Sequence, residues 1–267
     1  MEDFRQRYQE IPILILIPIA DSAKLVADMT SQLVQTVNYF GESRILVSFA
    51  VGASQDDTYS QVVETCQALH LSKILHRMQY TDDLDSWTER ALFGYMADFE
   101  LAVVVRGVIC ANDLVRLIIQ AVENDADMAC AVDVAFDKNH RILSKYVNLD
   151  TYSETRISAQ TLLHSTRLIQ AGCCDGSVKV IRLRSIRPTG LLPYECEDFI
   201  KVTSQSSIVR PKRLRPGNDR PLKIMISPSV KSSPDPDDFR TAMQLGFMDL
   251  QGYDHRPLVW EDNRRRS

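Results

Sequence analysis

The sequence lacks the short motifs that mark many nucleotide-dependent enzymes. It contains neither a G-x-G-x-x-G pattern nor a P-loop with its lysine, so dinucleotide-binding and kinase-like functions lose most of their support. None of the five histidines has a partner at motif spacing. Nucleophilic catalysis by a Ser/His/Asp arrangement therefore has no support either.

The six cysteines also lack a recognisable pattern. There is no CxxC pair and no Cys/His spacing typical of a zinc site. Cys110 and Cys130 lie inside apolar runs, and we predict that they are small buried hydrophobic residues. The redox compartment stays open.

Long hydrophobic runs and a strong net charge are missing as well. The densest apolar run, residues 11–20, contains two prolines and is far shorter than the roughly 20 residues of a membrane-spanning helix. Residues 1–10 include acids and form no positive n-region, so we expect neither a membrane span nor a signal peptide. A formal charge of -4 and a pI near 5.8 argue against coating nucleic acid or an anionic membrane.

The first half of the sequence alternates between strand and helix patterns, and 267 residues suffice for one large α/β domain or two small ones. We predict strands over residues 11–19, 45–52, 72–78, 101–110 and 128–136, and helices over 22–41, 58–69, 82–96 and 112–124. Gly41 should end the first helix, which Asp21 or Ser22 should cap. Such alternation predicts a mostly parallel sheet with helices on both faces.

The pattern is weaker beyond residue 136. We predict a helix around 158–170, strands over 177–183 and 222–230, and an exposed loop over 209–223 with six basic residues and three prolines. No internal repeat is visible. The basic loop is either a solvated face or a contact for a diphosphate or an anionic acceptor.

Small and acidic residues follow the second predicted strand. Ser54, Gln55, Asp56 and Asp57 come directly after it, and Thr58 opens the next helix. Ligands of open α/β sheets bind beyond the carboxyl ends of the strands. The sequence therefore predicts a candidate site at this strand end.

Several carboxylates could hold a divalent ion or act as a base. Asp125 and Asp127 have the spacing of a metal-binding pair, yet they close a helix, where solvated acids are common. Asp133 and Asp137 lie nearer the carboxyl end of a strand, and their alternative role is structural. Two further acids, which flank Cys196, could supply a general base or simply lie on the surface: Glu195 and Glu197.

Six stretches, taken in order between about residues 10 and 230, match one family pattern: "YFGESRILVSFAVGASQDDT", "VVVRGVICANDLVRLI", "ADMACAVD", "GCCDG", "YEC" and "KIMISPSV". The chain resembles the fungal family of cryptococcal α-1,3-mannosyltransferases and capsule-associated proteins, glycosyltransferase family 69. The resemblance implies a GT-A-like (Rossmann-like) fold in a single domain. Its nucleotide-sugar half would be residues 1–137, its acceptor half 138–230 and its tail 231–267.

The resemblance also implies a function, namely transfer of mannose from GDP-mannose to a saccharide with retention of the α configuration, in capsule or other polysaccharide synthesis. Mn2+ or Mg2+ would be the cofactor, and another glycosyltransferase could be a partner. The family carries an N-terminal membrane anchor and works in the secretory pathway, in the Golgi. This sequence shows no anchor, so a cytoplasmic location stays open.

Two departures from the family pattern affect the donor site. Val51 replaces an acid after the second strand, and Arg106-Gly107 replaces the N-D pair whose carboxylate should face the metal. Arg106 either pairs directly with a diphosphate or marks a site that has lost its metal.

We therefore assign hypothetical roles to the candidate residues. Ser54, Asp56 and Thr58 keep part of the nucleotide layout, Arg106 or a metal near Asp133 would stabilise the diphosphate, and Asp127 is a weaker metal candidate. Glu195 would orient the acceptor. The alternative is a catalytically inactive homologue that binds a glycan, a nucleotide or a partner protein.

Overall fold

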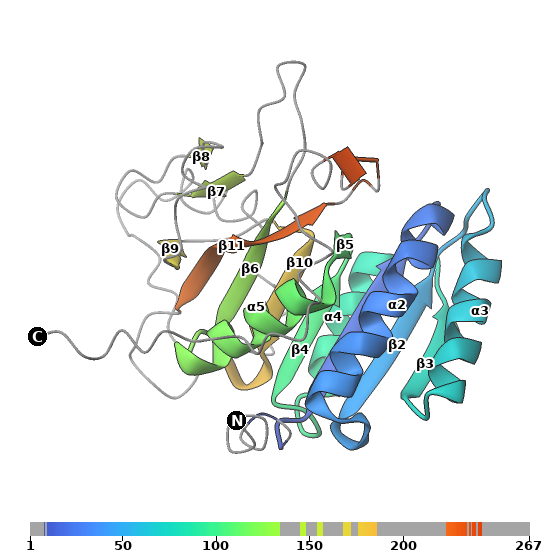
Figure 1. The fold of residues 1–267 in the computed structure, drawn as a ribbon, viewed down its shortest axis with the longest axis horizontal. Helices are drawn as coiled ribbons and strands as arrows, with labels where there is room; N and C mark the ends of the chain where they lie inside the picture. The colour runs from blue at the N-terminus through green and yellow to red at the C-terminus, as the bar shows by residue number, and fades with distance from the viewer. Residues whose placement is uncertain are drawn as a thin grey trace, which may run out of the picture.

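The structure is a computed structural model that describes residues 8, 10–133, 145–147, 154–156, 168–171, 176–185, 223–233, 235, 237–238 and 240–241. Within these residues, a nine-stranded sheet forms the centre of the molecule (Figure 1). Its strands are β1 (Ile13–Ile19), β2 (Ile45–Val51), β3 (Leu75–Tyr80), β4 (Leu101–Val105), β5 (Val108–Ile109), β6 (Met128–Asp133), β9 (Ile169–Ala171), β10 (Val178–Arg182) and β11 (Ile224–Ser233). The helices are α2 (Ala23–Phe40), α3 (Thr58–Leu71), α4 (Leu84–Gly94) and α5 (Ala111–Glu123), with short 3-10 turns at Glu42–Arg44 and Leu183–Ser185. A separate antiparallel pair consists of β7 (Lys145–Val147) and β8 (Glu154–Arg156).

The strand order is β3-β2-β1-β4-β10-β6-β11-β5, and β9 also pairs with β11. Strands β3, β2, β1 and β4 are parallel neighbours, as are β6 and β11. Strand β10 is antiparallel to both β4 and β6, while β5 and β9 are antiparallel to β11. The order β3-β2-β1-β4 is that of one half of a Rossmann sheet. The prediction of an α/β fold with a mostly parallel sheet is confirmed.

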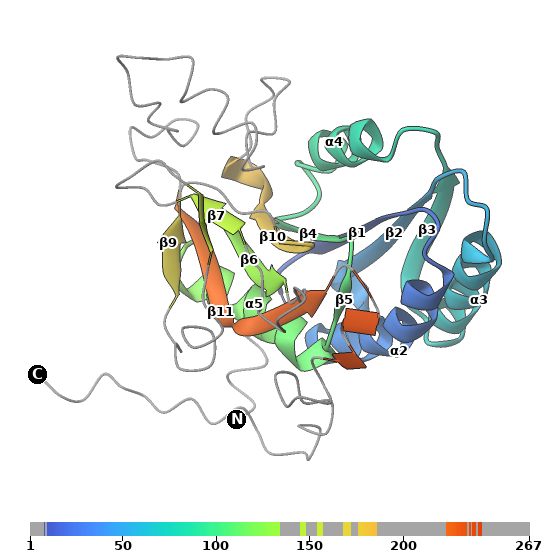
Figure 2. The same ribbon diagram turned by 90° about the horizontal axis from the view of Figure 1, so that it is seen from above.

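Helices cover both faces of this sheet, also as predicted. Figure 2 shows α4 on one face and α2, α3 and α5 on the other. All residues of β1 are buried, because a parallel strand covered on both faces has no side that meets water. No described helix has the length and apolar character needed to cross a bilayer.

Helix α2 begins and ends close to the predicted residues. It ends at Gly41, whose φ of 95° lies in the left-handed region that favours glycine. The group that caps its start differs from the prediction, because the Ser22 side chain makes no cap hydrogen bond to the helix. Asp56, from the loop after β2, accepts the hydrogen bond of the first helical N–H instead.

The predicted single strand over residues 101–110 is wrong. The chain forms β4 beside β1, breaks at Arg106-Gly107, and continues as β5 beside β11 at the far edge of the sheet. The apolar run is continuous on both sides of the break, so hydrophobicity alone does not indicate it. This break places Arg106 beyond the carboxyl end of β4.

Three smaller expectations also differ. The third strand begins at Leu75 rather than residue 72, and Ile169 and Gln170, expected at the end of a helix, lie in β9. The rest of that predicted helix, residues 158–167, lies outside the described residues. Cys110 is buried as predicted. Cys130 is buried too but is disulfide-bonded, so its description as a plain small hydrophobic residue is wrong.

Candidate functional site

The loops that follow β1 and β2 are tied together by polar contacts. The Asp21 N–H donates to Ser54 Oγ at 3.1 Å, and the Gln55 N–H donates to Asp21 Oδ1 at 2.6 Å. Ser54 Oγ in turn donates to the Gly52 carbonyl at 3.1 Å. Asp21 has a φ of 46°, a conformation that aspartate tolerates better than most residues. Ser54 therefore fixes the shape of the two strand ends.

Asp56 lies between the starts of two helices. Its Oδ2 accepts from the Ala23 N–H of α2 at 2.9 Å, and its Oδ1 accepts from the Thr58 N–H of α3 at 3.0 Å and from the Thr58 hydroxyl. Thr58 Oγ1 also accepts from the Ser22 N–H at 2.7 Å. The hydrogen bond from Ala23, followed by that from the Thr58 side chain, lowers the pKa of Asp56. Both carboxylate oxygens are thus engaged by the protein itself.

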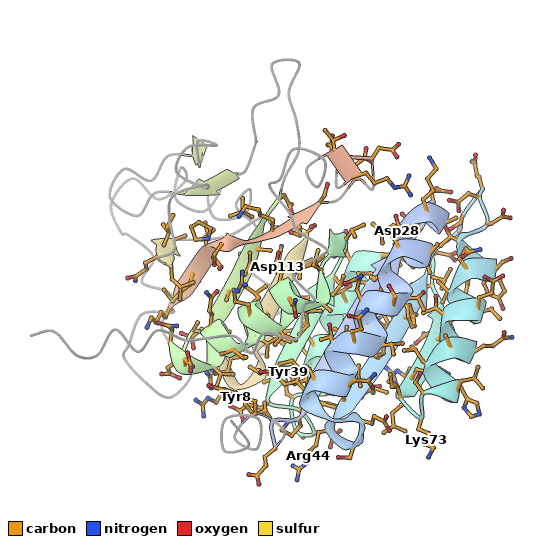
Figure 3. The ribbon with its side chains drawn as sticks, in the orientation of Figure 1. Tyr8, Asp28, Tyr39, Arg44, Lys73 and Asp113 are labelled. Carbon is orange, nitrogen blue, oxygen red and sulfur yellow. The ribbon has the colours of Figure 1, made fainter. Side chains whose placement is uncertain are left out.

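A cavity of about 330 Å³ opens beside these loops, at the carboxyl ends of β1 and β4. This volume is at the lower end of the range for small-molecule sites. Its walls come from the end of β1, the start of α2, the start of α4 and the end of β4: Pro18, Ile19, Ala20, Ser22, Leu25, Leu84, Asp85, Val105 and Arg106. Most are apolar, and Arg106 is the single cation among them. Figure 3 shows two other cations, Arg44 and Lys73, near the amino ends of β2 and β3, at the opposite end of the sheet.

Arg106 is held from two sides. Its backbone N–H donates to the Ser177 carbonyl at 2.8 Å, and its side-chain Nη2 lies 2.6 Å from Asp85 Oδ1 in an ion pair. The side chain of Arg106 is 37% exposed and that of Asp85 is 80% exposed. The guanidinium therefore lies at the mouth of the cavity, within reach of solvent.

Asp133, at the carboxyl end of β6, contacts the other side of Ser177. The Ser177 N–H donates to both carboxylate oxygens at 2.9 and 3.0 Å, and the hydroxyls of Ser177 and Ser232 donate to Oδ1 at 2.6 and 2.7 Å. Burial raises the pKa of Asp133, although the hydrogen bonds from Ser177 and Ser232 act in the opposite direction. Through Ser177, the structure brings Arg106 and Asp133 into one neighbourhood, but Asp133 does not line the cavity.

Gly107 makes this arrangement fit. A Cβ added to Gly107 would lie 2.5 Å from both Ser177 Oγ and the Ser233 carbonyl oxygen. No larger residue fits without a shift of β10 or β11. The Arg106-Gly107 departure therefore has a packing consequence as well as an electrostatic one.

The described residues do not fit a divalent metal ion. Hard cations take several oxygen ligands with free lone pairs, yet the Asp85 carboxylate faces Arg106 and the Asp133 oxygens already accept four hydrogen bonds. In the described part of the chain, no group of three His, Cys, Asp or Glu side chains could hold an ion.

The remaining candidates lie elsewhere. Asp127 is at the amino end of β6, opposite to Asp133; it is 2% exposed and accepts hydrogen bonds from the Ser185 hydroxyl and, at 2.7 Å, from the Lys223 N–H. Val51 is the last residue of β2 and is 1% exposed. The other candidates, Asp137, Glu195, Glu197 and most of the basic loop over 209–223, lie outside the described residues.

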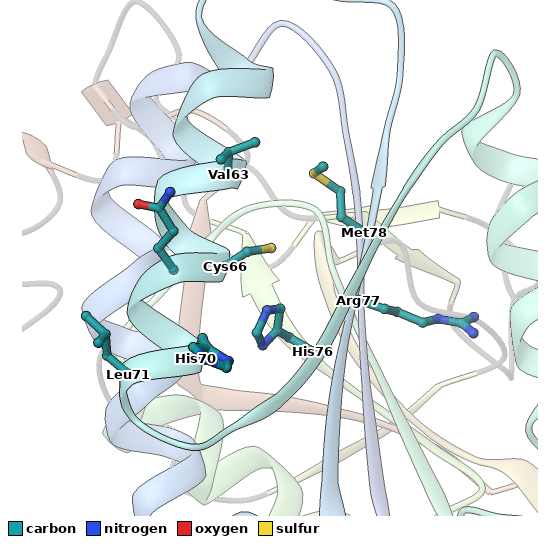
Figure 4. A pocket seen from close by; sticks show the side chains of 8 residues that line it. Val63, Cys66, His70, Leu71, His76, Arg77 and Met78 are labelled. Carbon is teal, nitrogen blue, oxygen red and sulfur yellow. The ribbon is translucent and has the colours of Figure 1, made fainter.

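A second cavity, of about 650 Å³, lies between α3 and the edge strand β3. Figure 4 shows His76 and Met78 pointing toward α3, while Arg77 points away from it. Arg77 instead donates to Ser48 Oγ at 2.9 Å and stacks over the Tyr95 ring. Val63 of α3 also lines this cavity. This second cavity lies away from the carboxyl ends of β1 and β4 and is therefore separate from the candidate site.

Sequence reasoning missed two residues of the site, Asp85 and Ser177. The acids at the start of α4 were visible, but a helix start favours acids for its own sake, so they gave no reason to expect an ion pair with Arg106. Ser177 had no signal, because its role arises only from the pairing of β10 with both β4 and β6.

Comparisons with known proteins give matches among solved structures only. No protein-family model matches the chain, and no curated protein matches it. The chain is similar to S. aureus TarS 1-349, with 15% identity and a TM-score of 0.44 over 88% of this chain and 64% of that one. It is also similar to mannosyltransferase PcManGT from Pyrobaculum calidifontis in complex with GDP-Man and Mn2+, with 10% identity and a TM-score of 0.46 over 85% of this chain and 63% of that one. A third similar structure is GalNAc-T7 with UDP, GalNAc and Mn2+, with 8% identity and a TM-score of 0.45 over 84% of this chain and 43% of that one. The chain thus spans less than two thirds of these structures, and the function has to be argued from the site.

Proposed function

We propose that this protein is a glycosyltransferase of GT-A-like fold that uses a nucleotide sugar as donor. The observation that carries the proposal is the cavity at the carboxyl ends of β1 and β4, with the Arg106 guanidinium at its mouth. Apolar walls suit a nucleoside, and a guanidinium matches phosphate oxygens in a bidentate geometry. All residues that line the cavity belong to the proposed nucleotide-sugar half, residues 1–137.

In this proposal the bond between the sugar's anomeric carbon and the diphosphate oxygen breaks, and a bond to an acceptor hydroxyl forms. Negative charge then develops on the leaving diphosphate, where Arg106 would stabilise it by donating hydrogen bonds. Ser54, Asp56 and Thr58 would act by holding the loops in place. Asp133 would position Ser177 and, through it, the Arg106 backbone. Glu195 is the proposed carboxylate that orients the acceptor and takes its proton.

The specific donor we propose is GDP-mannose, on the strength of the family resemblance, with a saccharide acceptor in the secretory pathway. Mn2+ or Mg2+ remains part of the proposal, although the described donor set does not fit an ion.

The second candidate is a nucleotide-binding homologue without turnover. The Arg106–Asp85 ion pair favours it, because a cation already neutralised by a carboxylate stands where the family pattern has an acid. Val51, an apolar residue where the pattern has another acid, points the same way.

One experiment separates the two. Purified protein is incubated with GDP-mannose and, for comparison, with UDP-GlcNAc, with and without Mn2+, and nucleotide release and melting temperature are measured. Loss of one charge-assisted contact in Arg106→Ala should weaken donor binding by roughly tenfold to a hundredfold, whereas Arg44→Ala, at the other end of the sheet, should behave like the wild type.

Release that depends on Arg106 supports the transferase. A rise in melting temperature with either nucleotide sugar but no nucleotide release supports the binding role. No response to any nucleotide or nucleotide sugar would contradict both.

A further inference from the structure

The acid that faces Arg106 belongs to a different element from the arginine. Arg106 follows β4, whereas Asp85 lies in the first turn of α4. Their ion pair, 2.6 Å from Nη2 to Oδ1, connects two walls of the 330 Å³ cavity. Any ligand whose charged group reaches Arg106 therefore comes close to Asp85 as well.

A carboxylate and a phosphate compete for the same edge of a guanidinium. Both present oxygen pairs that accept parallel N–H donors, and the geometry of the two contacts is alike. A phosphate close to Arg106 would also lie close to the Asp85 carboxylate, and like charges at such a distance repel each other. The two anions therefore cannot share the guanidinium without a cost.

We infer that Asp85 is a specificity-determining residue of the cavity, whose carboxylate occupies the phosphate position on Arg106. This inference rests on the proposed function. An anionic ligand binds after the Arg106–Asp85 ion pair opens, and its apparent affinity is reduced by the fraction of molecules in which the pair is closed. Ligands without a phosphate meet no such competition.

The local structure allows the pair to open. Asp85 is 80% exposed, so its carboxylate can turn into water. The start of α4 does not depend on it, because Asp83 supplies the cap: its Oδ1 accepts from the Ser86 N–H at 3.0 Å. Asp85→Asn should therefore leave α4 folded and remove only the competing charge.

The expected effect follows from two contributions. An exposed ion pair changes an equilibrium constant by up to about fivefold, and two unit charges about 4 Å apart in water contribute about another fivefold. Since the two overlap, Asp85→Asn should bind GDP and UDP roughly tenfold more tightly than the wild type. Higher salt should shrink this difference, because it screens exposed charges.

Calorimetry with the full chain tests this. The probes are GDP and UDP, with guanosine and uridine as their uncharged counterparts. Asp82→Asn is the matched control, because it removes the same charge from the exposed segment before α4. In an Arg106→Gln background, Asp85→Asn should have a clearly smaller effect on GDP binding.

Tighter GDP or UDP binding by Asp85→Asn alone, with nucleoside binding unchanged, supports the inference. It is overturned if Arg106→Gln weakens GDP binding while Asp85→Asn binds like the wild type, or if Asp85→Asn tightens guanosine binding equally; either result leaves the proposed function standing. If no variant, including Asp85→Asn, binds any of these nucleotides, both the inference and the proposed function fail.

Discussion

Asp56→Ala tests whether this carboxylate serves mainly to cap two helices. In the structure, Oδ2 accepts from the first N–H of α2 and Oδ1 from the first N–H of α3, at 2.9 and 3.0 Å. Loss of one N-cap side chain costs about 0.5 to 2 kcal/mol. Because one residue serves both helices but is exposed, we expect the free energy of unfolding to fall by about 2 kcal/mol. For a chain of this size the melting temperature should drop by roughly 4 to 8 °C.

Asp57→Ala is the control, since Asp57 lies next in the chain, is exposed and makes no side-chain cap hydrogen bond. Urea unfolding followed by circular dichroism measures both variants. The folded-state pKa of Asp56 is lowered, so its contribution is fully present above the ordinary aspartate pKa of about 4 and disappears as the pH falls through the lowered value. If the two variants were equally stable at neutral pH, the double-cap argument would be refuted.

Three further predictions concern Gly107 and Asp133, next to the site, and Arg182, at the opposite end of the sheet. Gly107→Ala should lower the free energy of unfolding by about 1 to 3 kcal/mol, because a Cβ there meets Ser177 Oγ at 2.5 Å. The control is Gly94→Ala in α4, where an added Cβ meets open space. Equal urea midpoints for the two variants would contradict the argument. Arg182→Ala should lower the free energy of unfolding in urea by about 2 to 4 kcal/mol, since the guanidinium is 4% exposed and pairs with Glu100 at 3.1 Å. A loss below about 0.5 kcal/mol, the scale of ordinary surface substitutions, would argue against a stabilising role of this buried ion pair. Burial raises the pKa of Asp133, so the folded state holds that proton more strongly than the unfolded state. The free energy of unfolding should therefore fall as the pH rises from about 4 through the raised pKa. Asp133→Asn should flatten this part of the stability–pH profile, and a profile identical to that of the wild type would exclude the effect.

Much of the fold could be predicted from local patterns. The alternation of strand and helix, the buried strands β1 and β2 and the glycine that ends α2 all follow from periodicity and from residue preferences. The break between β4 and β5 is missed, because the prediction treats the apolar residues on both sides of Arg106-Gly107 as one strand. It depends on the close approach of Gly107 to β10 and β11, segments that come much later in the chain.

The candidate site could be predicted less well. The cluster of polar residues after β2 follows from the sequence, but the position of Arg106 beyond a strand end does not, because the predicted strand over 101–110 runs through it. The pattern does not show that Ser54, Asp56 and Thr58 bond to the neighbouring loop and the helix starts, since a polar side chain at a strand end is equally suited to a ligand and to a backbone N–H. Only the pairing of distant segments decides between the two uses.

The same pairing explains why Arg106 and Asp85 meet. Strand β4 pairs with β1, and its carboxyl end lines the same cavity as the start of α4, the helix that covers one face of the sheet (Figure 2). Gly107 lets the chain turn away at once toward β11, and Arg106 stays at the cavity mouth with its backbone fixed to Ser177. A donor site with a cation supplied by the chain gains from an anchor of this kind, because a mobile loop would lose backbone conformational entropy on every binding event. The anchor fixes the backbone and leaves the guanidinium free to exchange Asp85 for a phosphate, so affinity for anions can change by substitution of Asp85 without disturbing the sheet.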